Sequence, residues 1–274
     1  MIQDMKVFIA DIDGTLICKG EAMLPRTRAA LQRLHEEGVL VGIASGRPLD
    51  YRILDKAKEW DLGFDFDLAL GMNGGDVYDR FHEGISHNHL LKKELIRKIL
   101  TFLDGEDVNA IVYENGYDQI SCLRMDEFME GSIKRNHSHV EVGDIDRLSR
   151  YDTGKLEVHY FPENEEHILK VIADNADPAW NCVKTFTGTV EFMDPDLNKG
   201  AGLRHFCELN GYDLANVIGF GDMQNDIELV RTAGWGVAML NGCDETKAAA
   251  DDITEYPVEE DGLGRYLEDH WFNR

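Results

Sequence analysis

Residues 6–16 read KVFIADIDGTL, and this stretch decides the fold class. Its apolar run, Val7–Ala10, is typical of a central parallel strand that is buried on both faces. The run delivers two acids, Asp11 and Asp13, just before a Gly-Thr break. Ligand sites in open α/β sheets lie at this end of the strands. We therefore expect both acids at the mouth of a site, and the alternative for this motif alone is a polar strand end followed by a tight turn.

The size and charge of the chain narrow the class of protein. It has 274 residues, 43% of them hydrophobic, which suits one large domain or a core domain that carries an inserted one. Its 28 basic and 52 acidic residues give a formal charge of −24. This charge argues against nucleic acid or an anionic membrane surface as the main partner. A phosphate site would need a local cation, and carboxylate oxygens favour Mg2+.

The cysteines and the first residues bear on the compartment. The five cysteines are scattered without a CxxC pair, so we expect neither a zinc ribbon nor a disulfide framework, and a reduced cytoplasm is the simplest interpretation. The chain does not begin with a basic segment followed by a long apolar run, and its apolar stretches are shorter than a membrane span.

The order of predicted strands and helices divides the chain into a core and an insertion. The βα alternation at both ends predicts a Rossmann-like parallel-sheet core formed by residues 1–79 and 191–274. Residues 80–190 change to an α+β pattern, which predicts an inserted cap domain. Inserted domains of this size commonly cover a ligand crevice. The core elements expected are strands at 7–10, 39–44, 66–70, 217–220 and 236–239 and helices at 26–37, 49–60, 198–210, 227–233, 245–250 and 262–271.

Polar side chains follow several of these strands. They are Asp11, Asp13, Ser45, Asp222 and Asp226, with Lys199 at the start of a nearby helix. Because the carboxyl ends of parallel strands meet at one edge of a sheet, we expect these side chains to lie together. So many carboxylates would repel one another unless a cation lies among them. Mg2+, bound by a few carboxylates and completed by water and phosphate oxygens, fits this set.

Four ordered motifs resemble those of the haloacid dehalogenase-like (HAD) superfamily. They are DIDGT at 11–15, SGR at 45–47, Lys199 and GDMQND at 221–226. The insertion after the third strand and the NGG at 73–75 make the chain similar to the Cof-type phosphatase branch, which carries an α/β (C2-type) cap. The resemblance implies a magnesium-dependent phosphatase that hydrolyses small-molecule phosphomonoesters, such as sugar phosphates, phosphorylated cofactors or nucleotides, through an aspartyl-phosphate intermediate.

The resemblance also implies a role for each matched residue. Asp11 is the nucleophile, and Asp13 protonates the leaving oxygen and then activates water. This division is chemically reasonable, because a carboxylate displaces an alkoxide from phosphorus only when cations neutralise the phosphoryl oxygens and the leaving group is protonated. The remaining implied roles are metal binding by Asp11, Asp222 and the Asp13 backbone carbonyl, phosphate binding by Ser45, Gly46 and Lys199, orientation of these ligands by Asn225 and Asp226, and substrate contact by Arg47 and Asn73.

Several of these residues have a structural alternative. Ser45 would be a turn hydroxyl, and Arg47 would form a structural salt bridge. Asp226 would cap a helix, with or without a role at the metal site. Lys199 would be a solvated lysine, but a helix start is a poor place for a cation, which favours the functional interpretation.

Residues outside the four motifs are less informative. Asn73 and Asn241 are either turn residues in left-handed geometry or neighbours of the site. Ten histidines without HExxH spacing give no reason to expect zinc. The expected cap carries cationic side chains that would either meet an anionic substrate or be solvated, namely Arg124, Lys134, Arg135, His137, His139, Lys155 and Lys184.

Two other functions are compatible with the motifs. A phosphomutase would return the phosphoryl group from the same aspartate to a sugar hydroxyl instead of to water. A non-catalytic regulator that binds a phosphate ligand would often have lost an essential acid, whereas Asp11, Asp13 and Asp222 are all present. In each case the expected partner is a small phosphorylated molecule, and the sequence does not indicate an oligomeric state.

Overall fold

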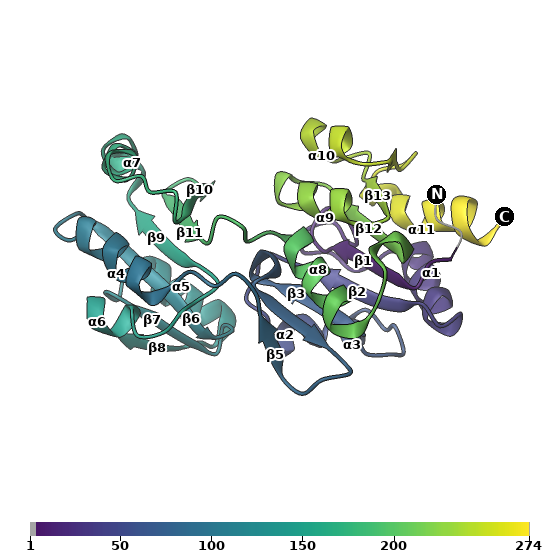
Figure 1. The fold of residues 1–274 in the computed structure, drawn as a ribbon, viewed down its shortest axis with the longest axis horizontal. Helices are drawn as coiled ribbons and strands as arrows, with labels where there is room; N and C mark the ends of the chain where they lie inside the picture. Colours follow the sequence, from purple (N-terminus) through teal and green to yellow (C-terminus); the bar gives the residue numbers. More distant parts are fainter. Residues whose placement is uncertain (1–3, 274) are drawn as a thin grey trace. The chain divides into compact units, whose positions relative to one another are not determined.

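The computed structural model describes residues 4–273, which separate into two compact units (Figure 1). The first unit combines the two ends of the chain, up to Asn88 and from Asn198 onward. The second unit is continuous, from His89 to Leu197. Within residues 4–273, no helix is both long enough and apolar enough to span a bilayer.

The first unit is built on a sheet of eight strands, in the order β14-β13-β12-β1-β2-β3-β4-β5. β1 is central and pairs in parallel with β2 and β12, and parallel pairing continues to β3 on one side and β14 on the other. Only β4 and β5 run antiparallel to their neighbours. The strands are β1 (Val7–Asp11), β2 (Leu40–Ala44), β3 (Leu68–Gly71), β4 (Asp76–Asp79), β5 (Ile85–His87), β12 (Val217–Gly221), β13 (Trp235–Ala238) and β14 (Asp252–Ile253).

Helices cover both faces of this sheet. Successive side chains of β1 point to opposite faces of the sheet, and both faces are apolar. Phe8 packs in the hydrophobic cluster on one face, and Ile9 packs in the cluster on the other face. Helices α1, α2, α3 and α11 cover the Phe8 face, and α8 and α9 cover the Ile9 face. The helices are α1 (Pro25–Glu36), α2 (Tyr51–Leu54), α3 (Lys56–Glu59), α8 (Lys199–Asn210), α9 (Ile227–Thr232), α10 (Asp244–Ala249) and α11 (Gly262–Leu267). The predicted Rossmann-like α/β core is confirmed.

The boundaries of the inserted unit differ from the expected 80–190. β5 pairs with β4, so the segment up to Asn88 stays in the first unit. At the other end, β11 (Thr189–Met193) belongs to the sheet of the second unit and carries that unit to Leu197. The helix expected over 49–60 is also different, because it consists of two short helices that meet at Asp55.

The second unit is an α+β module, as predicted. Its six-stranded sheet has the order β10-β11-β9-β6-β7-β8. Helices α4 and α7 pack on one face through Ile99 and Ile168, and α5 packs on the other through Met129. The elements are β6 (Val108–Asn115), β7 (Gln119–Cys122), β8 (His139–Val142), β9 (Leu156–Tyr160), β10 (Asn181–Phe186), α4 (Lys93–Phe102), α5 (Glu127–Asn136), α6 (Ile145–Leu148) and α7 (Glu165–Asp174).

Candidate active site

The first unit brings a lysine onto the first aspartate of the DIDGT motif. Asp11 is the last residue of β1, and Lys199 is the first residue of α8. Lys199 is fully buried, and its Nζ donates to Asp11 Oδ1 and, at 2.5 Å, to Asp226 Oδ1. The start of the helix is capped separately, because the Asn198 side chain accepts from Ala201 N. The ammonium group therefore bridges two carboxylates that come from opposite ends of the chain.

Asp226 has a different local role from the expected helix cap. It precedes α9, but its side chain makes no capping hydrogen bond to that helix. Its Oδ2 instead accepts from the backbone N–H groups of Asp222 and Met223, both at 3.0 Å. Because Oδ1 is bound to Lys199, Asp226 joins the lysine to the loop that follows β12.

Asp222 lies against the loop that follows β1. Thr15 is buried, and its Oγ1 donates to Asp222 Oδ1 at 2.9 Å. Gly14 has φ +97°, and a Cβ atom at this position would overlap Asp222 Oδ2. Asn241 Nδ2 donates to the Gly14 carbonyl oxygen at 2.8 Å, which ties the loop after β13 to the same turn. The GDMQND and DIDGT motifs are thus in direct contact.

The SGR motif contributes one buried hydroxyl and one ion pair. Ser45 follows β2 and is buried, and its Oγ accepts from Arg47 N at 3.2 Å. The Arg47 guanidinium forms an ion pair with the Asp13 carboxylate. Gly46 lies beside Asn73, whose Oδ1 would be 3.1 Å from a Cβ atom at Gly46. The motif therefore lies beside the second aspartate of DIDGT, which matches both interpretations of Arg47.

Asn73 connects the turn after β3 to two of the motifs. Its backbone is left-handed, with φ +55°, as the turn interpretation predicts. Its N–H donates to the Ser45 carbonyl oxygen at 3.1 Å, and its Oδ1 accepts from Asn225 Nδ2 at 3.1 Å. Asn73 is therefore both a turn residue in left-handed geometry and a neighbour of the site. Asn241 is a neighbour of the site too, but its backbone is not left-handed.

The buried carboxylates carry more charge than the lysine balances. Burial raises the pKa of Asp11 to about 7, with Lys199 opposing this shift and Asp226 adding to it. Burial also raises the pKa of Asp222 to about 6, against the hydrogen bond from Thr15. For Lys199, burial lowers the pKa, but Asp11 and Asp226 outweigh it and hold the value above its usual range.

This arrangement fits a hard divalent cation. Carboxylate oxygens of Asp11, Asp222 and Asp226 all lie within 4.8 Å of one another. The donors are oxygens only, which Mg2+ prefers, and a cation there would relieve the repulsion that helps to raise the two pKa values. Asp226 has its oxygens bound to Lys199 and to backbone N–H groups, so Asp11 and Asp222 are the more available ligands.

The predicted cationic residues of the insertion all lie in the second unit, and several have partners there. Arg124 pairs with Asp107 at 2.7 Å, and Lys184 pairs with Glu165 at 2.7 Å. Lys155 is buried and lies 2.6 Å from Glu191 and 3.4 Å from Glu157. Each pair gives a structural reason for the cation that does not require a substrate.

Sequence reasoning missed one residue of the site. Thr15 lies within the quoted DIDGT motif but received no role, because a threonine after glycine usually indicates a turn. Its position close to the end of the buried strand was the one feature of the sequence that could have indicated a role at the site. The structure shows that its hydroxyl group binds a carboxylate of another motif.

Comparison with known proteins shows to which family the chain belongs. A family model described as haloacid dehalogenase-like hydrolase matches residues 8–267. Two similar proteins of Bacillus subtilis (strain 168) are named 5-amino-6-(5-phospho-D-ribitylamino)uracil phosphatases. YitU is 26% identical over 95% of this chain and 96% of its own length, and YcsE is 27% identical over 98% and 96%.

Solved structures show the same fold. A protein of Thermotoga maritima superposes with a TM-score of 0.84 at 24% identity and covers 97% of both chains. A structure described as a HAD subclass IIB sugar phosphatase has a TM-score of 0.77 at 24% identity and covers 97% of this chain and 98% of its own. At these identities the structural similarity is evidence for the fold alone.

Proposed function

The chain belongs to the haloacid dehalogenase-like hydrolase family, in its Cof-type branch, and from this premise we propose that it is a magnesium-dependent phosphatase of small phosphomonoesters. The observation that carries this proposal is the contact of one buried lysine with Asp11, beside the Asp222 carboxylate. A carboxylate held next to a cation at the end of a central strand is a suitable acceptor for a phosphoryl group.

We assign the chemical step to Asp11 and Asp13. One Asp11 oxygen attacks phosphorus, and the bond to the leaving oxygen breaks while Asp13 donates a proton to it. Asp13 then removes a proton from the water that cleaves the aspartyl-phosphate. Arg47, paired with Asp13, would fix the position of this carboxyl group.

The phosphate group would be held by residues at the neighbouring strand ends. The Ser45 hydroxyl and the Gly46 backbone N–H would donate to phosphoryl oxygens, and Lys199 would supply positive charge beside them. Asp11, Asp222 and the Asp13 carbonyl oxygen would hold Mg2+, with Asp226 and Asn225 orienting these groups. Bound Mg2+ would supply the charge that neutralises the phosphoryl oxygens.

The relatives and the inserted unit support the proposed substrate class. YitU and YcsE are named for a phosphorylated ribitylamino pyrimidine, so this compound belongs in the first panel tested, beside sugar phosphates, phosphorylated cofactors and nucleotides. We propose that the inserted unit acts as the cap that selects among them. Such a cap would also exclude water from the reacting centre.

The test compares an aryl phosphate and this panel with Mg2+ and with a chelator. We expect Mg2+-dependent phosphate release by the parent and by Asp65→Asn, a change at an exposed carboxylate of the same unit. Asp11→Asn should abolish release while its circular dichroism spectrum stays that of the parent. Turnover by Asp11→Asn at the parental rate would refute the assignment of the nucleophile.

The two rival functions give different results in the same panel. A phosphomutase would isomerise a sugar phosphate and leave no free phosphate. A regulator would bind phosphorylated ligands without turnover of any of them. The complete carboxylate and lysine set argues against the regulator, and the products of the reaction distinguish the hydrolase from the mutase.

A further inference from the structure

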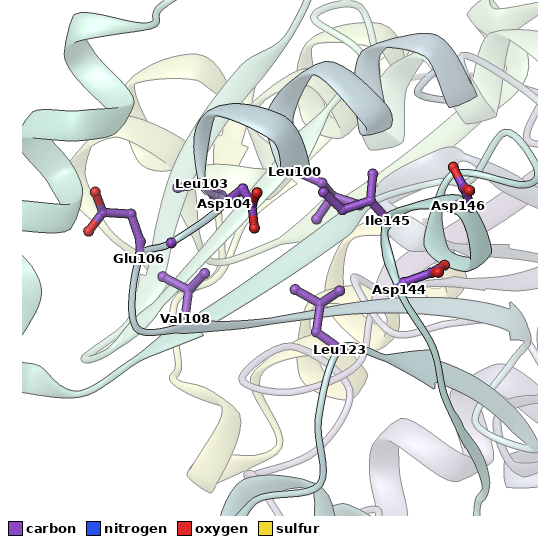
Figure 2. A pocket seen from close by; sticks show the side chains of 10 residues that line it. Leu100, Leu103, Asp104, Glu106, Val108, Leu123, Asp144, Ile145 and Asp146 are labelled. Carbon is purple, nitrogen blue, oxygen red and sulfur yellow. The ribbon is translucent and has the colours of Figure 1, made fainter.

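The second unit contains a cavity that the proposed reaction does not use. Its volume is about 400 Å³, within the range of small-molecule sites (Figure 2). It lies between the end of α4, the following loop and the start of α6. The residues that line it are Leu100, Leu103, Asp104, Gly105, Glu106, Val108, Leu123, Asp144, Ile145 and Asp146.

The middle of the cavity is aliphatic. Leu100, Leu103 and Val108 are buried members of the unit's main hydrophobic core, and Leu123 and Ile145 are partly buried against that core. These side chains present methyl and methylene groups but no hydrogen-bonding atoms. A ligand that covers them therefore binds favourably only where its own apolar surface is buried against them.

The polar side chains of the cavity are all carboxylates, in two pairs. Asp104 and Glu106 come from the loop after α4, and Asp144 and Asp146 flank the first residue of α6 (Figure 2). No lining residue is basic. The last turn of α4 also lacks a basic residue, so its carbonyl groups add negative potential near Asp104.

The existing partners of these carboxylates are weak competitors for a ligand. Glu106 pairs with His167 at 2.7 Å, and Asp146 pairs with Arg97 at 2.6 Å, but both partners are exposed. Exposed ion pairs contribute little to stability, so a ligand displaces them at small cost. Asp144 Oδ1 caps α6 by accepting from Arg147 N, which leaves Oδ2 for a ligand.

We propose that this cavity binds a linear aliphatic diamine or polyamine, with one ammonium group at the acidic loop after α4, the other at the acidic start of α6 and the methylene chain across the aliphatic floor. Two charged ends and an apolar middle match such a molecule in both respects. A divalent metal ion would leave the floor unused, and a neutral apolar ligand would remove water from the carboxylates without replacing its hydrogen bonds. The charges exclude an anionic ligand.

Calorimetric titration of the full chain with amines tests this directly. The probes are putrescine, cadaverine, hexamethylenediamine and spermidine, with hexylamine as the monoamine of matched chain length. We expect the best diamine to bind about fivefold more tightly than hexylamine, because only a diamine reaches both carboxylate pairs and an exposed ion pair contributes up to about 1 kcal/mol. Equal affinity for hexylamine and hexamethylenediamine would overturn the proposal.

Variants separate this site from general attraction to an acidic protein. Asp104→Asn combined with Glu106→Gln should weaken diamine binding about fivefold. The matched control, Glu163→Gln with Glu166→Gln, removes the same charge from exposed positions of the same unit and should leave the affinity unchanged. Equal weakening in both double variants would show only nonspecific attraction, and no weakening in either would also refute the site.

A floor variant tests the apolar part of the proposal. Leu123→Thr keeps every charge but makes the floor less apolar. It should lower the affinity for diamines in proportion to their number of methylene groups, so that the affinity for long diamines falls more than the affinity for short ones. Unfolding temperatures should first show that each variant is folded, and Asp104→Asn alone, at an exposed position, replaces any double variant that is not. Because the readout is binding, these results do not depend on the proposed phosphatase activity.

Discussion

Thr15 Oγ1 lies 2.9 Å from Asp222 Oδ1, and this hydrogen bond joins two motifs that are 207 positions apart in the sequence. It opposes the effect of burial, which raises the pKa of Asp222 to about 6. The hydroxyl group therefore favours the ionised carboxylate, which is the form that binds a metal ion.

Thr15→Val removes this donor and keeps the shape of the side chain. We expect the pKa of Asp222 to rise, and the Mg2+ concentration for half-maximal activity at neutral pH to increase about tenfold, since a hydrogen bond to a charged group contributes roughly 1.5–3 kcal/mol. Titration with Mg2+ at several pH values measures this. Thr15→Ser restores the hydroxyl group and should behave like the parent, whereas equal behaviour of the two variants would contradict the role of the hydrogen bond.

Lys199→Met should lower both stability and activity. The change leaves Asp11 and Asp226 buried without their cation, which costs about 3 kcal/mol or more in the free energy of unfolding. Lys199→Met with Asp226→Asn should recover part of that stability but none of the activity. Urea unfolding and phosphate release measure the two effects, and a fully active single variant would show that the ammonium group has no role in the reaction.

Two glycine substitutions separate backbone strain from contact with the site. Gly14 and Gly20 both have positive φ, +97° and +81°, but a Cβ atom at Gly20 would meet no atom within 4 Å. Gly20→Ala should therefore cost only about 1 kcal/mol and keep activity. Gly14→Ala should cost more and abolish Mg2+-dependent turnover, because the new methyl group displaces the Asp222 carboxylate. Activity of the Gly14 variant equal to that of the Gly20 variant would argue against this placement of Asp222.

Glu157 in the second unit should make stability depend on acid pH. Burial opposes its ionisation, but the His159 hydrogen bond and the Lys155 charge outweigh burial and lower its pKa from 4.5 to about 2. The folded state thus binds the proton more weakly than the unfolded state. Its stabilising effect is complete above pH 4.5 and is lost as pH falls toward 2.

Glu157→Gln tests this dependence. The substitution should cost about 3 kcal/mol at pH 7, and the difference from the parent should shrink as pH falls below 4.5. Urea unfolding of both proteins from pH 7 to pH 3 gives the measurement. A difference that stays constant over this range would mean that the ionisation of Glu157 does not contribute.

The sequence was sufficient to predict the core strands and the edge at which the motifs gather. A buried apolar run that ends in an acid indicates both the strand and its chemical end, so Asp11 and Asp222 could be placed together. The residue pattern around Ile85 did not predict that this segment forms the edge strand β5 of the first unit, because short exposed edge strands lack an apolar run.

Contacts between distant side chains could not be predicted in the same way. The reach of Thr15 to Asp222, and the backward capping by Asp226, depend on how the loops fold against one another. Likewise, the helix expected over 49–60 has helical composition, but Asp50 caps a first short helix that already ends at Asp55. Periodicity indicates that a segment is helical more reliably than where its turns are interrupted.

The division of the first unit between both ends of the chain has a consequence for synthesis on the ribosome. Asp11 leaves the ribosome early, but Lys199 and the strand β12, which pairs with β1, follow only after the whole second unit. The second unit is continuous and can fold while the chain is still growing. The first unit must keep the apolar β1 uncovered on one edge until the last third of the protein is made. A ribosome that stops before Lys199 therefore releases a chain with a folded insertion, an unpaired central strand and no phosphate site, a natural target for chaperones and proteases.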